Sequence, residues 1–200
     1  MADLPTMRRS PLHDLHARLA AADVPGERGV TLREVPFLAM VSIRVQPGSA
    51  AFPRISAVLG AALPEACGQT SSSGPHTALW LGPDEWLVVS DAERGPLVAD
   101  LTEALGDAPG AVVDVSANRT TVELSGPSAR ATLEKGCPVD LRERSFRPGS
   151  AVATTLGPVP LVLWQTGATT YRLLPRGSFA DYVARWLIDA TREFASPQVA

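Results

Sequence analysis

The sequence is poor in the residues that build disulfide-stapled or zinc-stabilised domains. Its 200 residues include only two cysteines, Cys67 and Cys137, and three histidines, His13, His16 and His76. Two cysteines are too few for a disulfide framework, and no CxxC spacing is present. Because the histidines are scattered, no structural zinc site is expected. We therefore expect two free thiols in a reducing, cytoplasmic environment.

Long apolar runs and an excess of positive charge are also missing. No stretch approaches the ~18 apolar residues that a membrane span needs. Arg8 and Arg9 have no apolar run behind them, so we expect no signal peptide. The formal net charge is −3 and the only lysine is Lys135. This composition predicts neither a membrane nor a nucleic acid as a partner.

The motifs that commonly mark catalysis are absent as well. There is no GxGxxG turn for a dinucleotide, and the serine-rich stretch 65–76 lacks the GK[ST] of a phosphate-binding loop. No histidine accompanies a recognisable nucleophile motif. Lys135 lies near Cys137 and could activate its thiol, but a buried structural cysteine is the favoured interpretation. The residues thus predict no catalytic, cofactor-binding or metal-binding residue in this chain.

What the sequence does have is the composition of an ordinary folded domain, with 45% apolar and 20% charged residues. A chain of this length buries roughly 70% of its extended-chain surface on folding, so it needs no disulfide bond or structural metal to be stable. Residues 1–29 are an exception, because they are polar and contain several prolines and glycines. We expect them to form an extended N-terminal arm with one short helix near 11–21.

The rest of the chain alternates between strand and helix patterns. Alternating apolar residues and flanking turn residues indicate strands, and apolar residues three and four apart indicate helices. The predicted strands are 31–45, 77–81, 86–89, 111–124 with a break near Asn118, 150–156, 159–165 and 170–174. The predicted helices are 50–63, which Pro64 stops, 91–105, 125–135 and 178–194, and residues 65–76 are expected to form a loop.

The last predicted helix has a candidate cap and a candidate buried face. Ser178 is the expected N-cap residue, with Asp181 as its capping partner. The expected buried stripe consists of Phe179, Tyr182, Val183, Trp186 and Leu187.

Two stretches of the sequence share one pattern. Residues 85–105 and 170–190 each contain an aromatic-led strand, a short turn and an amphipathic helix, which indicates an internal duplication. Helices that follow mostly antiparallel strands are typical of an α+β fold. We expect an arm at 1–29, a first α+β unit at 30–124 and a second, closely packed unit at 125–196.

Three polar residues form a candidate structural cluster. Asp114, Asn118 and Arg119 lie where the strand region 111–124 is interrupted. Polar side chains at such a break usually tie loop backbone together, and ligand binding is the alternative.

Three tryptophans are candidate interface residues. Trp80 and Trp86 flank the hairpin turn, and Trp186 lies on a helix face. Core packing is the default interpretation for each. Burial of at least one against a partner chain is the alternative, because tryptophan is enriched in binding hot spots.

A specific combination of motifs runs along most of the chain. It comprises LREVPFLAMVSIR at 32–44, LWLGPDEWLVVS at 79–90, VVDVSANRTTVELSGPSARATLEKGCPVDL at 112–141 and RGSFADYVARWLIDA at 176–190. With Ser10-Pro11-Leu12 near the start, this combination resembles the gamma-subunit family of heterotetrameric sarcosine oxidases. The resemblance extends from residue 10 to residue 193.

The central stretch also resembles the folate-binding aminomethyltransferase superfamily, through Asp114-Val115-Ser116, Leu124, Gly126-Pro127 and Ala129. This resemblance implies a duplicated fold of two ferredoxin-like units. Where that superfamily carries a key aspartate facing the folate, before LWLG, this chain has His76 and Thr77. The departure counts against independent folate chemistry.

The gamma-subunit resemblance implies a non-flavin partner chain of a complex with alpha, beta and delta subunits. That complex would oxidatively demethylate sarcosine to glycine, with hydrogen peroxide and formaldehyde or methylenetetrahydrofolate as further products. The resemblance places FAD, FMN, NAD, tetrahydrofolate and zinc in the other subunits, and implies no catalytic residue here.

Two alternatives remain at this point. One is a subunit of a related N-methyl amino-acid dehydrogenase, such as N-methylglutamate dehydrogenase. The other is a stand-alone folate-binding factor of iron–sulfur protein maturation, a group that carries KGCxxGQE. This chain has Lys135-Gly136-Cys137 but continues with Pro138-Val139-Asp140, so its match to that motif is superficial.

Overall fold

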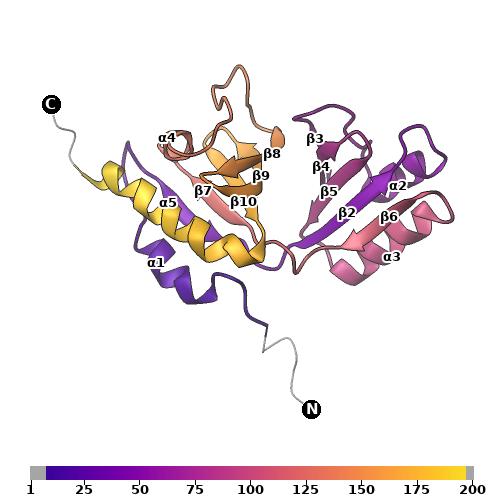
Figure 1. Ribbon diagram of the computed structural model, residues 1–200, viewed down its shortest axis with the longest axis horizontal. Helices are drawn as coiled ribbons and strands as arrows, with labels where there is room; N and C mark the ends of the chain where they lie inside the picture. Colours follow the sequence, from indigo (N-terminus) through magenta and orange to yellow (C-terminus); the bar gives the residue numbers. More distant parts are fainter. Residues whose placement is uncertain (1–7, 197–200) are drawn as a thin grey trace, which may run out of the picture.

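The computed structural model describes residues 8–196, which form two five-stranded sheets in which all neighbouring strands are antiparallel (Figure 1). The first sheet has the strand order β3-β4-β5-β2-β6. Its strands are β2 (Ala39–Val45), β3 (Thr70–Ser73), β4 (His76–Gly82), β5 (Glu85–Ser90) and β6 (Gly110–Asp114). Its helices are α2 (Ala51–Leu59) and α3 (Arg94–Leu105).

The second sheet has the strand order β1-β7-β10-β9-β8. Its strands are β1 (Thr31–Glu34), β7 (Val122–Ser125), β8 (Ala151–Leu156), β9 (Val159–Gly167) and β10 (Thr170–Pro175). Its helices are α1 (His16–Ala20), α4 (Ala129–Glu134) and α5 (Ala180–Ala195), with short 3-10 turns η2 (His13–Leu15) and η3 (Gly177–Phe179).

The two sheets have equivalent connections. The first unit runs β2-α2-β3-β4-β5-α3 and the second runs β7-α4-β8-β9-β10-α5. In the first sheet the edge strand β6 lies beside β2, and in the second sheet the edge strand β1 lies beside β7 in the equivalent place. Four strands in the order β6-β2-β5-β4, with two helices between them, make a ferredoxin-like unit to which β3 adds an edge. The predicted duplicated α+β fold is confirmed.

The expected domain boundaries differ from the sheets that the strands form. Strand β1 and all but the last residue of β7 fall in the expected first unit, 30–124, yet the two strands pair with each other and belong to the second sheet. The long strand region 111–124 is interrupted because its two halves, β6 and β7, belong to different sheets. Residues 39–114 therefore form one unit, and residues before and after them together form the other.

The N-terminal segment is a built-in part of the second unit. Leu12, Leu15 and Leu19 are 0%, 6% and 1% exposed, and they pack in the same cluster as strands β7, β9 and β10. This burial corrects the expectation of an arm that packs poorly on its own domain, although the short helix near 11–21 is present. Residues 1–7 of that expected arm lie outside the described residues.

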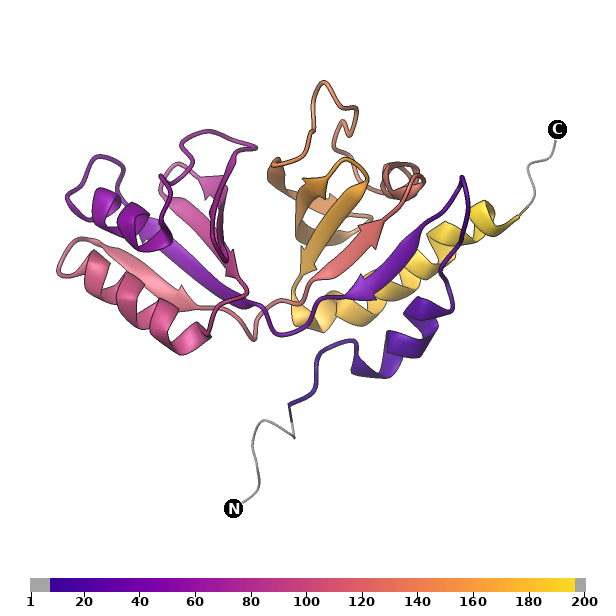
Figure 2. The ribbon, with the colours of Figure 1, turned by 180° about the vertical axis from the view of Figure 1, so that it is seen from behind.

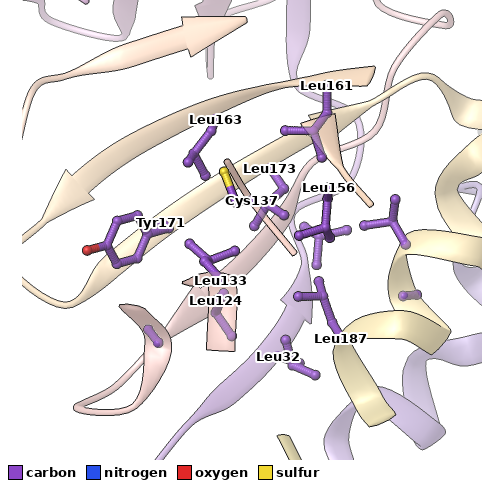
Figure 3. Packing of buried hydrophobic residues seen from close by; sticks show 14 of the residues in the cluster. Leu32, Leu124, Leu133, Cys137, Leu156, Leu161, Leu163, Tyr171, Leu173 and Leu187 are labelled. Carbon is purple, nitrogen blue, oxygen red and sulfur yellow. The ribbon is translucent and has the colours of Figure 1, made fainter. Parts of the chain in front are cut away.

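Helices cover the outer face of each sheet, and the inner faces meet. One core cluster, part of which Figure 3 shows, lies between the second sheet and α1, α4 and α5. Another lies between the first sheet and α2 and α3, the helices on the outer side of that sheet in Figure 2. A third cluster joins inner-face residues of both sheets, among them Met40, Leu87, Trp164 and Leu174. At roughly 25 cal/mol per Å² of apolar surface, such burial holds the two units together.

Four local predictions need correction. Helix α2 ends at Gly60, whose φ of +70° supplies a left-handed C-cap, and not at Pro64. The expected loop 65–76 contains strand β3, an edge strand held by backbone pairing with β4. Helix α5 begins at Ala180 after η3, and Ser178 makes no capping hydrogen bond there. The expected stripe of α5 also fails at Phe179 and Tyr182, which are 40% and 45% exposed.

Candidate functional site

The titratable side chains do not form a metal-binding cluster in residues 8–196. In that part of the chain no three His, Cys, Asp or Glu side chains could hold a metal ion. Cys67 is exposed and Cys137 buried, and both are free thiols. No helix among the same residues is long and apolar enough to cross a membrane.

The position before LWLG, where a folate-facing aspartate would be sought, is the start of β4. His76 is half-buried there, and its Nδ1 lies 2.9 Å from the hydroxyl of Ser90 on the neighbouring strand. Thr77 lies 2.9 Å from the hydroxyl of Ser72 across the β3–β4 pair. Both side chains face polar groups of their own sheet and neither offers a carboxylate, so the residues present do not fit that role.

The three candidate interface tryptophans are mostly covered by this chain itself. Trp86 is 1% exposed and its indole N–H donates to the carbonyl of Pro64 at 2.7 Å, so it is a core residue and not a surface anchor. Trp80 and Trp186 are half-buried and pack against the cores of the first and second units. The ring of Trp186 lies so close to Gly136 that a Cβ at that position would be 2.5 Å from it.

The large apolar side chains that are exposed lie elsewhere. Among the described residues they are Phe37, Val113, Phe179 and Tyr182, between 40% and 49% exposed. Phe37 is also the one non-glycine residue in the described part with a positive φ, +65°, a conformation that costs about 1 kcal/mol or more. An exposed aromatic ring on strained backbone is typical of a residue kept for contact rather than for stability.

The candidate cluster Asp114, Asn118 and Arg119 lies where the chain crosses from the first sheet to the second. Oδ1 of Asp114 accepts a hydrogen bond from the backbone N–H of Ser116 at 3.0 Å. The Ser116 hydroxyl in turn accepts from the N–H of Met40 at 2.9 Å and lies 3.3 Å from its carbonyl. These bonds join the β6–β7 crossing to the start of β2.

Two forces act in opposite directions on the pKa of Asp114. Partial burial acts to raise it, but the hydrogen bonds from Ser116 and the nearby charge of Arg94 outweigh this effect. The pKa of Asp114 is therefore held below its ordinary value. The guanidinium of Arg94 lies 3.3 Å from the Asp114 carboxylate, which also joins α3 to the crossing.

Arg119 and Asn118 connect the β6–β7 crossing to the second unit. The guanidinium of Arg119 donates to the carbonyl of Leu174 at 2.8 Å. The carbonyl of Asn118 accepts from the N–H of Gly177 at 2.8 Å. The structure thus brings all three residues onto one crossing, but Asn118 contributes its backbone rather than its side chain to these bonds.

A buried carboxylate that the sequence did not single out lies beside this crossing, at the end of β1. The Glu34 side chain is 0% exposed and accepts from the Ser10 hydroxyl at 2.5 Å and from the Thr120 hydroxyl at 2.6 Å. It also accepts from the Leu12 N–H at 3.3 Å, and Nε2 of His16 lies 2.7 Å away. Four partners from two distant segments satisfy the carboxylate, which compensates the cost of burying it.

A second buried carboxylate, Glu123, lies on the inner face of the second sheet. Arg33 on β1 and Arg172 on β10 both bind it, the latter at 3.0 Å. Burial acts to raise the pKa of Glu123, but the hydrogen bonds from the two arginines prevail and hold it below its ordinary value. The Arg172 guanidinium also lies 5.3 Å from the ring centre of Trp164. Nothing local in the sequence marks these pairs, because their members are 49 and 90 residues apart.

The arrangement of the two units defines the class of fold. The structure superposes on the glycine cleavage system aminomethyltransferase T from Bartonella henselae with a TM-score of 0.63 over 92% of this chain and 59% of that one, at 14% identity. That likeness shows the fold alone, a duplicated aminomethyltransferase-like α+β fold.

The particular family follows from higher similarity. Residues 45–193 match the model of the "Sarcosine oxidase, gamma subunit family". The sarcosine oxidase subunit gamma of Corynebacterium sp. (strain U-96) is 46% identical over all of this chain and 98% of its own length. That of Arthrobacter sp. is 45% identical over 98% of this chain and 95% of its own.

A solved structure agrees with both. A chain of heterotetrameric sarcosine oxidase from Corynebacterium sp. U-96, in complex with pyrrole 2-carboxylate, has a TM-score of 0.94 and 44% identity. The match covers 97% of this chain and 100% of that one. This chain belongs to the sarcosine oxidase gamma subunit family.

Proposed function

We propose that this chain is the gamma subunit of a heterotetrameric sarcosine oxidase, and that it acts by binding and supporting its partner chains. The observation that carries the proposal is the end-to-end similarity to gamma subunits, with a chain of the heterotetramer superposing at a TM-score of 0.94. The partners would be alpha, beta and delta subunits in the cytoplasm.

The chemistry in this proposal belongs to the other subunits. They would hold FAD, FMN, NAD, tetrahydrofolate and zinc and would demethylate sarcosine oxidatively to glycine. The lack of a dinucleotide fingerprint in the sequence supports this division, because close approach to a pyrophosphate needs a glycine-rich turn. The purified chain should therefore be colourless, and a stoichiometric flavin absorbance band in it would contradict the division.

Four exposed apolar side chains are the proposed partner contacts: Phe37, Val113, Phe179 and Tyr182. They replace the buried tryptophan Trp86 in this role. Large aromatic side chains give the most binding free energy when a partner covers them, commonly 2 kcal/mol or more for each hot-spot residue. No other large apolar side chain in the described part is as exposed.

Coexpression of the four chains with size-exclusion chromatography and native mass spectrometry tests the proposal. We expect Phe179→Ser with Tyr182→Ser, or Phe37→Asn with Val113→Ser, to reduce the recovered heterotetramer at least about tenfold, which corresponds to about 1.4 kcal/mol. Asparagine is chosen at position 37 because it tolerates a positive φ. Each double variant should melt within a few degrees of the parent chain, because exposed side chains contribute little to the fold.

One result would contradict the proposed role, and another would contradict only the proposed contacts. If the unchanged chain does not associate with the coexpressed subunits, the gamma-subunit role fails. If both double variants assemble as well as the parent, the role stands but these four side chains are not its contacts.

A further inference from the structure

Strand β6 is an outer strand of the first sheet, and one of its edges has no neighbouring strand among the described residues (Figure 1). On its other edge it pairs with β2 without a register shift. Val113 is 49% exposed, so β6 is the one outer strand of the two described sheets that carries an exposed large apolar side chain. An edge of this kind is a template on which another chain can add a strand.

The ladder with β2 determines which backbone groups of β6 point toward the free edge. The Val115 N–H donates to the Met40 carbonyl at 2.9 Å. Because bonded positions recur at every second residue of an antiparallel pair, Val113 also bonds to β2. The N–H and carbonyl groups of Val112 and Asp114 therefore point away from the sheet. Outside this ladder, no backbone-to-backbone hydrogen bond in the described part of the chain involves these two residues.

Strand β6 has none of the features with which outer strands usually avoid pairing. Its sequence, Gly-Ala-Val-Val-Asp, has no lysine and no proline, and its pairing has no bulge. Val112 and Val113 are β-branched, which favours an extended strand. Val112 packs against the core cluster under α3, so the strand is held in place while its edge stays open.

The equivalent strand of the second unit, β1, shows how such an edge is covered. The Leu32 N–H on its outer edge donates to Oδ1 of Asp23 at 3.0 Å. Helix α1 contacts β1 as well, with Leu19 in the same core cluster as Leu32. The N-terminal segment thus covers this edge, whereas no described residue bonds to the equivalent edge of β6. The duplicated fold leaves one of two equivalent edges for another molecule.

The charge of the first unit indicates which kind of molecule suits that edge. Residues 39–114 contain nine aspartate or glutamate residues, three arginines and no lysine. All three arginines already bind carboxylates or backbone carbonyls of the same unit. Asp100, Glu103 and Asp107 are exposed on α3 or in the turn that leads to β6. A second copy of this unit would bring like charges together, whereas a basic segment is attracted.

We propose that the free edge of β6 binds an extended, basic segment of a partner subunit, which adds a strand to the first sheet. Backbone hydrogen bonds to Val112 and Asp114 give the affinity in this mode, and side chains of the added strand cover Val113. The inference rests on the gamma-subunit role proposed above and identifies how the first unit takes part in it.

Hydrogen exchange at single-residue resolution tests the proposal by comparing the full-length chain alone with the coexpressed, purified heterotetramer. We expect the amides of Val112 and Asp114 to exchange at least about tenfold more slowly in the complex than in the free chain. Val113, which bonds to β2, and Leu32, which bonds to Asp23, are the control amides. Both should exchange slowly in the two states.

Two pairs of variants separate the backbone contribution from the charge contribution. Val112→Pro removes the outward N–H without removing a bond within this chain. It should reduce the recovered heterotetramer at least about tenfold, whereas Val112→Ala, which keeps the N–H, should not. Val113→Lys should assemble about tenfold less well than Val113→Glu, because only the lysine repels a basic segment. The second pair leaves the backbone unchanged, so it is informative even if the proline variant does not fold.

Several outcomes overturn the proposal while the gamma-subunit role stands. One is a complex in which Val112 and Asp114 exchange as fast as in the free chain, or a folded Val112→Pro variant that assembles like the parent. Another is protection of these amides in a dimer of the isolated chain, which would mean that a second copy occupies the edge. A third is equal assembly of Val113→Lys and Val113→Glu, which would mean that the segment is not basic. Failure of the unchanged chain to form any complex would overturn the role and this proposal together.

Discussion

Replacement of Glu34 by alanine should destabilise the second unit more than any other single carboxylate change. The carboxylate is fully buried and accepts from the Ser10 hydroxyl, the Leu12 N–H and the Thr120 hydroxyl, besides its contact with His16. The three donor residues are 8%, 0% and 4% exposed, so water does not replace the lost acceptor easily. Each buried donor left without a partner costs about 1 kcal/mol at the least, which gives about 3 kcal/mol in total.

That loss is a large share of the about 5–15 kcal/mol by which domains of this size are stable. Urea unfolding of the full-length chain measures it directly. Hydrogen exchange should show the effect first in residues 10–20, because Glu34 ties this segment to β1. Glu34→Gln keeps the shape and one acceptor, so it should fall between the parent and the alanine variant.

The matched control is Glu27→Ala, since Glu27 is exposed and lies in the same N-terminal region. It should leave the free energy of unfolding within about 0.5 kcal/mol of the parent. If Glu34→Ala also lies within that margin, the four contacts contribute nothing net, and the account of how the N-terminal segment is held is refuted.

Three further changes have definite expected results. Deletion of residues 1–20 should unfold the second unit, seen as loss of its cooperative melt, because it removes three leucines from the core at about 2 kcal/mol or more each. Glu123→Gln should destabilise the chain above about pH 4.5, and since the folded pKa is lowered, the difference from the parent should shrink as pH falls through that pKa in acid titration melts. We propose a structural role for Asp114, so Asp114→Ala should lower the melting temperature by a few degrees, whereas an unchanged melt with lost complex activity would favour ligand contact.

Elements whose signal is local were predictable from the sequence. Helix α3 and the hairpin of β4 and β5 follow the apolar spacing and the Gly-Pro-Asp turn, which act within a few residues. The register of β1 against β7 was not predictable, because residues 31–34 pair with residues 122–125. Strand β3 was missed because its Thr-Ser-Ser-Ser sequence has no apolar alternation and is held by backbone bonds alone.

The candidate site residues divide in the same way. Asp114 and Arg119 were recognisable because polar residues interrupt an apolar strand pattern. Glu34 and Glu123 were not, because a carboxylate on a strand looks solvent-exposed until its partners from distant segments are known. Trp86 is the core residue that the default interpretation expected, although nothing nearby in the sequence indicates that its indole N–H donates to the Pro64 carbonyl.

The placement of β1 explains why the two units form one support. Residues 35–38 and 115–121 are the two connections between the units. They bond to each other where the Val35 N–H donates to the Thr121 carbonyl at 2.8 Å. The second connection also bonds to β2, where the Val115 N–H donates to the Met40 carbonyl at 2.9 Å. On another side, Gly68 pairs with Ala151 across the two sheets. A hinge needs a few free residues at one connection, whereas here two bonded connections, an edge contact and a shared core fix the angle between the sheets. A chain that supports partners needs surfaces held at a constant separation, and this double attachment provides it.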